Sequence, residues 1–240
     1  TMTVHLARES AAPIAIWAVP EPRAGGRLRL NAFCGINLAS HALGKAGMAH
    51  GWLYAEPDEE GIHADLIQLA SPASVKQTRA QPVSTATDNA EAQRVLAALK
   101  GSRIGVVGQH PDGFDTCEYD AGRLNNLAGV AVDRFSLDTL FEKAKAANTE
   151  RVANVNAQVA AALDGVHEVD SQQLDRSYRV YCGLQDLQQE AGLKGMAVRC
   201  WPEMFTEYGC AACGPMAMMN QDGVPCGCEA DVYGTLSALM

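Results

Sequence analysis

Short apolar runs that alternate with helix-like segments are the feature that most restricts how this chain can fold. Ile14–Val19 (IAIWAV) is a continuous apolar run between two prolines, a pattern typical of a strand buried on both faces. Further strands are expected at Gly51–Ala55, Arg103–Val107, Val130–Phe135, Met196–Cys200 and Val224–Cys228. With helices between these strands, the alternation predicts an α/β fold of mainly parallel sheets flanked by helices, in Rossmann-like or flavodoxin-like units.

The expected helices carry recognisable start and stop signals. Ser136 is placed to cap a helix over Leu137–Ala147, and Gly165 breaks a long helical region between Thr149 and Leu193. The remaining helices are expected at Asn31–Gly47, Ala64–Gln68, Ala90–Lys100, Cys210–Met219 and from about Ala230 onward.

Composition excludes several classes of protein. The chain of 240 residues has 19 basic and 28 acidic side chains, a formal net charge of −9, and no basic stripe, which argues against nucleic-acid binding. Its hydrophobic content of 48% is too high for a disordered protein. No run approaches the roughly 20 apolar residues of a membrane span, and no secretory signal is visible. We therefore expect a cytoplasmic protein that contacts neither membranes nor nucleic acid.

The domain organisation is predicted from a polar stretch and from the end of the chain. Residues 82–89 (PVSTATDN) indicate a surface connection, which suggests that residues 1–100 end an N-terminal α/β domain and that 101–240 form a central one. The chain stops at Met240 inside an apolar helical pattern without a cap. This pattern favours a segment of a longer multidomain polypeptide over an intact protein with a frayed end.

Eight cysteines occur in the sequence, and five of them fall between Cys200 and Cys228. A chain of this size and apolarity does not need disulfides to fold. The pairs Cys210/Cys213 and Cys226/Cys228 permit three interpretations: small hydrophobic residues of the core, a structural zinc site, or redox chemistry. Their Ala-, Gly- and Met-rich surroundings favour the core interpretation.

Polar residues follow several of the predicted strands, where ligands collect in open α/β sheets. The loop after residue 107 contains Gly108, His110 and Asp115, and it is either a plain turn or a ligand contact. Trp201 and Glu203 follow the strand that ends near Cys200, and an aromatic wall beside an acid suits a sugar.

Glu229 and Asp231 follow the last predicted strand. Asp231 can cap the helix behind it, whereas Glu229 can act as a ligand of Mg²⁺ or Mn²⁺ and as an acid or base. Capping and metal binding are compatible with each other.

These residues belong to a longer pattern that resembles the L-fucose isomerase and L-arabinose isomerase superfamily. The resemblance rests on Val198–Glu203 (VRCWPE), Asn220–Pro225 (NQDGVP) and Cys228–Leu236 (CEADVYGTL). It also includes Lys100–Gly108 (KGSRIGVVG) with Asp115 and Tyr119-Asp120 downstream. It covers residues 100–240 well and residues 1–99 only loosely.

The resemblance implies a metal-dependent isomerase that interconverts an aldose and a ketose through an enediol. It assigns Glu229 as first metal ligand and acid/base, with Mn²⁺ or another divalent cation as cofactor. Trp201, Glu203 and Asp231 are expected to bind the sugar, an L-fucose- or L-arabinose-like monosaccharide. The remaining ligands are expected beyond Met240, and a homo-oligomer with a shared site is expected. The alternatives are a non-catalytic sugar-binding or regulatory domain and a zinc-stabilised structural module.

Overall fold

The computed structural model describes residues 2–10, 14–22, 31–71 and 90–240. The chain divides into two compact units, Thr1–Thr85 and Ala86–Met240. The connection expected at residues 82–89 lies outside the described residues. The placement of a domain boundary at residue 100 stays a prediction. No helix among the described residues combines the length and apolarity needed to cross a membrane.

The first unit is a small parallel sheet with helices. Its elements are α1 (Met2–Glu9), β1 (Ile14–Ala18), α2 (Ala32–Lys45), β2 (His50–Tyr54) and α3 (Ile62–Ala70). β1 and β2 pair in parallel, with Ile14 opposite His50. Asn31 caps α2, because its side chain accepts a hydrogen bond from the Cys34 amide at 2.9 Å. Leu43 of α2 is fully buried in the core of this unit.

The prediction that Ile14–Val19 is buried on both faces is wrong. Positions along β1 alternate between half-buried and exposed, and Trp17 is 40% exposed. The physical reason is that, among the described residues, β1 pairs only with β2, and the apolar cluster that includes Ile14 and Ile16 covers one face. The apolar run therefore predicted the strand correctly but not its burial.

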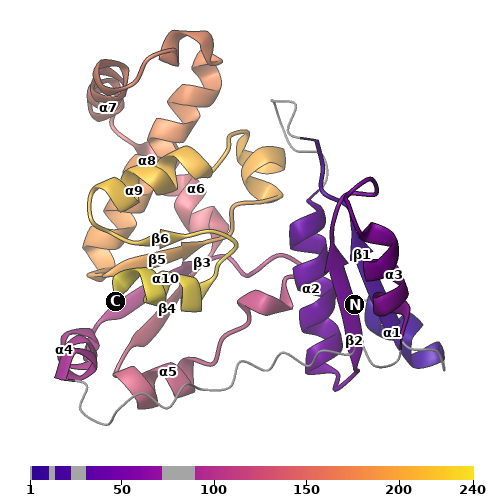
Figure 1. The fold of residues 1–240 in the computed structure, drawn as a ribbon. Helices are drawn as coiled ribbons and strands as arrows, with labels where there is room; N and C mark the ends of the chain where they lie inside the picture. Colours follow the sequence, from indigo (N-terminus) through magenta and orange to yellow (C-terminus); the bar gives the residue numbers. More distant parts are fainter. Residues whose placement is uncertain (1, 11–13, 23–30, 72–89) are drawn as a thin grey trace. The chain divides into compact units, whose positions relative to one another are not determined.

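The second unit is a four-stranded parallel sheet in the order β4-β3-β5-β6, with helices on both faces (Figure 1). The strands are β3 (Arg103–Val107), β4 (Ala131–Phe135), β5 (Gly195–Val198) and β6 (Cys226–Gly227). The helices are α4 (Ala90–Leu99), α5 (Ala121–Ala128), α6 (Leu137–Ala146), α7 (Thr149–Ala162), α8 (Ser171–Ala191), α9 (Cys213–Gln221) and α10 (Val232–Leu239). This arrangement confirms the predicted α/β class.

Alternation along the strands divides the core into two layers. Val107, Met196 and Val198 face the larger layer, which they share with α6, α7, α8 and α9. Ile104, Val106 and Ala197 face the smaller layer, formed with α4, α5 and α10. A strand buried on both faces by helices is the expected state of a parallel sheet. The predicted break at Gly165 is confirmed, since this residue has φ +74° and separates α7 from α8.

Four elements differ from expectation. The strand expected at Val224–Cys228 is only Cys226–Gly227, and β5 ends at Val198, before Cys200. A one-turn π-helix, Met204–Tyr208, precedes α9 and takes part of the segment between β5 and that helix. Helix α5 was not anticipated, because its sequence AGRLNNLA contains a glycine and two asparagines, which are weak helix formers.

Candidate functional site

The turn between β6 and α10 holds Glu229 in a constrained backbone conformation. Glu229 and Ala230 have φ values of +59° and +55°, in the left-handed region that costs roughly 1–2 kcal/mol per residue without glycine. The turn is fixed because the Ala230 amide donates to the Val198 carbonyl at 3.1 Å, which attaches it to the end of β5. Strained backbone of this kind concentrates at functional sites.

Burial and a neighbouring charge act on Glu229. Its side chain is half-buried, and burial raises the pKa of its carboxyl group, with the negative charge of Asp231 as a second cause. A carboxyl group whose pKa lies above its usual value is better matched to proton transfer near neutral pH. The placement of Glu229 just after a strand agrees with the sequence prediction.

Asp231 is the N-cap of α10. Its Oδ1 accepts a hydrogen bond from the Gly234 amide at 2.9 Å, and this capping role was one of the two predicted for it. This hydrogen bond involves one of the two carboxylate oxygens of Asp231, Oδ1. Its predicted role in sugar binding stays a prediction.

A cavity of about 270 Å³ lies at the carboxyl ends of the strands. Its lining residues are Val106, Gly108, Gln109, His110, Glu118, Tyr119, Arg134 and Ala230. Ala230, not Glu229, is the member of the β6–α10 turn that lines this cavity. Arg134 lies over the Tyr119 ring, 5.4 Å from the centroid, so the cavity wall contains a cation supported by an aromatic face.

A second cavity of about 500 Å³ shares Gly108, Gln109 and Arg134 with the first. Its other lining residues are Phe135, Ser136, Leu137, Arg199 and Glu203. Arg134 is therefore the cationic side chain common to both cavities. Sequence reasoning missed it, although its position next to last in the predicted strand Val130–Phe135 was a usable signal.

The loop after β3 brings three possible metal donors together. The donor atoms of His110, Asp115 and Glu118 all lie within 4.8 Å of one another. The sequence pointed to His110 and Asp115 but not to Glu118. Among the described residues, neither Glu229 with Asp231 nor the four cysteines 210, 213, 226 and 228 form such a three-donor group.

This loop and the Glu229 turn are neighbours. The Asp120 amide donates to the Tyr233 hydroxyl of α10 at 3.1 Å. Burial is the main reason why the pKa of Cys117 rises to about 11, and the charges of Asp231 and Glu229 contribute to the rise. The acidic groups that follow β6 thus act on a residue of the loop that follows β3.

Trp201 and Glu203 occupy different surroundings. Trp201 is 38% exposed and meets Phe114 edge to face, with centroids 5.5 Å apart. Glu203 lines the larger cavity, but Arg199 donates to both of its carboxylate oxygens. The charge of Glu203 is thereby matched inside the protein, and sugar binding by these two residues stays a prediction.

The fold and these groups define an α/β protein with a polar cleft at the carboxyl edge of a parallel sheet, equipped with carboxylates, an imidazole and a cation. Such a cleft suits a small polar molecule and proton transfer. No protein-family model matches the chain.

Curated proteins of similar sequence indicate which kind of α/β protein this chain resembles. The sulfoquinovose isomerase of Alkalicoccus urumqiensis is 30% identical over 229 residues, which cover 94% of this chain and 46% of that protein. Sulfoquinovose isomerases of Clostridium sp. (strain MSTE9) and Priestia aryabhattai are 29% and 27% identical, with the same shares covered. The chain is therefore similar to sugar isomerases throughout, and it spans about half the length of these relatives.

Proposed function

We propose that this chain forms part of an aldose–ketose isomerase whose substrate is sulfoquinovose, a glucose derivative with a sulfonate group. The observation that carries the proposal is the similarity to sulfoquinovose isomerases over 94% of the chain. It is supported by a constrained, half-buried carboxylate at the carboxyl edge of the sheet. Kinship with the L-fucose and L-arabinose isomerases is part of the proposal, whereas those two sugars are its less favoured substrates.

Glu229 is proposed to transfer the proton between C2 and C1 of the sugar. In an aldose–ketose conversion a base removes the proton from C2 of the aldose and an acid returns one to C1. A single carboxyl group near both carbons can perform both steps, since the raised pKa of Glu229 brings its two protonation states closer in free energy.

A divalent cation such as Mn²⁺ is proposed as cofactor, with Glu229 as a ligand and Asp231 close by. Carboxylate oxygens are ligands of the kind that Mn²⁺ prefers. Burial and, second, the charge of Asp231 raise the pKa of Glu229, and a nearby cation would offset both effects. When bound, such an ion stabilises negative charge that develops on the sugar oxygens. Further donors are proposed to come from a second subunit of the predicted homo-oligomer.

Arg134 is proposed to recognise the sulfonate. A protein of net charge −9 needs a local cation to attract an anionic sugar. The charge of Arg199 is matched by Glu203, whereas no ion pair involving Arg134 occurs within the described ranges. Arg134 also lines both cavities, and a guanidinium fits the oxygens of a tetrahedral anion.

The test is turnover by the full-length protein with Mn²⁺, followed by ¹³C NMR of the sugar. Sulfoquinovose, glucose, L-fucose and L-arabinose are supplied separately, and Glu229→Gln is the matched variant. A ketose signal from sulfoquinovose that is lost in the variant and in excess chelator supports the proposal. Saturable binding of sulfoquinovose without turnover would instead favour the alternative, a non-catalytic sugar-binding domain.

A further inference from the structure

The carboxyl ends of β5 and β6 bring two thiols into contact. Cys200 lies two residues after β5, and Cys228 directly follows β6. The two strands pair in parallel with Met196 opposite Cys226, so the next residues leave the sheet side by side. The Sγ atoms of Cys200 and Cys228 are 2.8 Å apart.

The two thiols differ in access to solvent. Cys228 is exposed, whereas Cys200 is buried and packs in the larger core layer. An oxidant therefore reaches Cys228 first, and Cys200 is the sulfur placed to complete a bond with it. A shift of less than about 1 Å brings two sulfurs at this separation to the disulfide length of roughly 2.05 Å.

We infer that Cys200 and Cys228 form a reversible disulfide pair that fixes the turn carrying Glu229. The oxidant required is a low-molecular-weight disulfide such as oxidised glutathione. The Cys228 thiolate attacks one sulfur of that disulfide and releases one small thiol. The Cys200 thiolate then attacks the Cys228 sulfur and releases the second. The protein loses two electrons and two protons, and the small disulfide gains both.

The bond would act on the Glu229 turn through short connections. Cys228 precedes Glu229 in sequence, and the Ala230 amide already donates to Val198 at the end of β5. A disulfide would add a covalent link between the same two strand ends. We therefore expect the oxidised protein to unfold at a higher temperature and the Glu229 and Ala230 amides to exchange more slowly.

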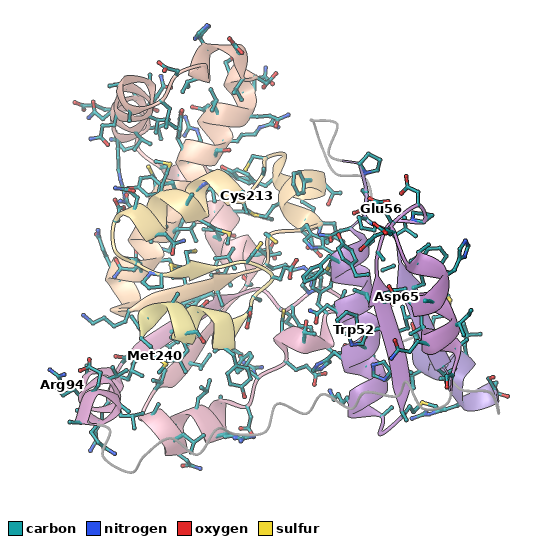
Figure 2. The ribbon with its side chains drawn as sticks, in the orientation of Figure 1. Trp52, Glu56, Asp65, Arg94, Cys213 and Met240 are labelled. Carbon is teal, nitrogen blue, oxygen red and sulfur yellow. The ribbon has the colours of Figure 1, made fainter. Side chains whose placement is uncertain are left out.

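Cys213 is the other cysteine that could pair with Cys228. It is exposed at the start of α9, where Figure 2 labels it. Among the described cysteines, however, the short sulfur–sulfur contact is the one between Cys200 and Cys228. Cys213→Ser is thus the matched control, because it removes a nearby exposed thiol without removing the proposed pair.

The experiment maps disulfides in the full chain after equilibration with oxidised glutathione and acid quenching. Trypsin cannot separate the cysteines, because the sequence from Cys200 to Met240 contains no lysine or arginine. Further cleavage after Glu203, Glu207 and Glu229 and before Asp222 isolates Cys200 from Cys210/Cys213 and from Cys226/Cys228. Fragmentation of the peptide from Asp222 to Glu229 in the mass spectrometer then distinguishes Cys226 from Cys228.

The expected result is a Cys200–Cys228 linked peptide that dithiothreitol removes and that persists in Cys213→Ser. Cys200→Ser should leave a glutathione adduct on Cys228 and abolish the rise in unfolding temperature. A link between Cys213 and Cys228, or adducts on Cys228 without any link in the wild-type protein, would overturn the inference. The wild-type map decides the question even if a serine variant folds poorly.

Discussion

The guanidinium of Arg199 holds the carboxylate of Glu203 on both oxygens, at 2.5 Å from Nε and 2.7 Å from Nη2. The remaining nitrogen, Nη1, donates to the main-chain carbonyls of Gln109 and His110, each at 3.2 Å. Glu203 therefore orients Arg199, and Arg199 supports the loop after β3 that lines both cavities. The pair links the ends of two neighbouring strands.

Replacing Glu203 by Gln should destabilise the protein in a pH-dependent way. The Arg199 guanidinium lowers the pKa of the Glu203 carboxyl, so its contribution to stability is full above the unfolded-state pKa of about 4.3 and disappears as pH falls through the lower folded-state value. At pH 7 we expect Glu203→Gln to cost about 1–2 kcal/mol in urea unfolding. The difference in free energy of unfolding between the variant and the wild-type protein should disappear at low pH.

The exposed Glu207 provides the control, because Glu207→Gln changes net charge equally only four residues away. It should alter the free energy of unfolding by less than about 0.5 kcal/mol. An equal cost of Glu203→Gln at neutral and at acidic pH would show that the carboxylate charge is not the source.

Replacing Arg134 by Gln should impair use of a sulfonated sugar and spare a neutral one. Loss of a charge-assisted hydrogen bond costs about 1.5–3 kcal/mol, which corresponds to roughly a 10- to 150-fold rise in KM for sulfoquinovose. Any activity on glucose should change little. The measurement is steady-state kinetics with both sugars.

Arg103→Gln is the matched control for Arg134, since it removes the same charge at the opposite end of the sheet, where Arg103 begins β3 and pairs with Asp133. Equal effects of the two variants on KM would mean that net charge, rather than Arg134 itself, attracts the substrate.

Replacing Gly183 by Ala should destabilise the packing of α8 on α6. A Cβ at Gly183 would lie 3.0 Å from the Ala144 nitrogen and 3.3 Å from its Cα, and backbone cannot recede easily. We expect a loss of about 1–3 kcal/mol despite the better helix propensity of alanine. Gly214→Ala, where nothing lies within 4 Å of the added Cβ, should be neutral or stabilising in the same thermal unfolding experiment. Equal behaviour of the two variants would contradict this packing.

Local signals predicted the elements whose structure depends on local chemistry. Arg103–Val107 forms a strand with the expected bounds, and Ser136 caps α6 by accepting from the Thr139 amide. Helix α5 and the short β6 depend on tertiary contacts instead. Leu124 is buried against the sheet, and only two residues of the last apolar run pair with β5.

Only part of the candidate site was predictable from the sequence. Glu229 and Asp231 could be found because they follow one apolar run directly. Arg134 could not be grouped with His110, because it lies on β4 and meets the loop after β3 only when the parallel strands place their carboxyl ends together. Glu118 lies on the same loop as His110, but no local pattern set it apart. The contact between Cys200 and Cys228 also depends on strand order, β5 beside β6.

The most direct test of the proposed isomerase is proton exchange at the sugar in D₂O, followed by ¹H NMR with the full-length protein, Mn²⁺ and sulfoquinovose. Transfer by Glu229 predicts that deuterium enters C1 or C2 during interconversion. It also predicts that Glu229→Gln slows this exchange by at least about 10²–10⁴-fold while the protein stays folded. Exchange in the Glu229→Gln protein at the wild-type rate, with an unchanged melting curve, would contradict the assignment of Glu229 as the acid and base.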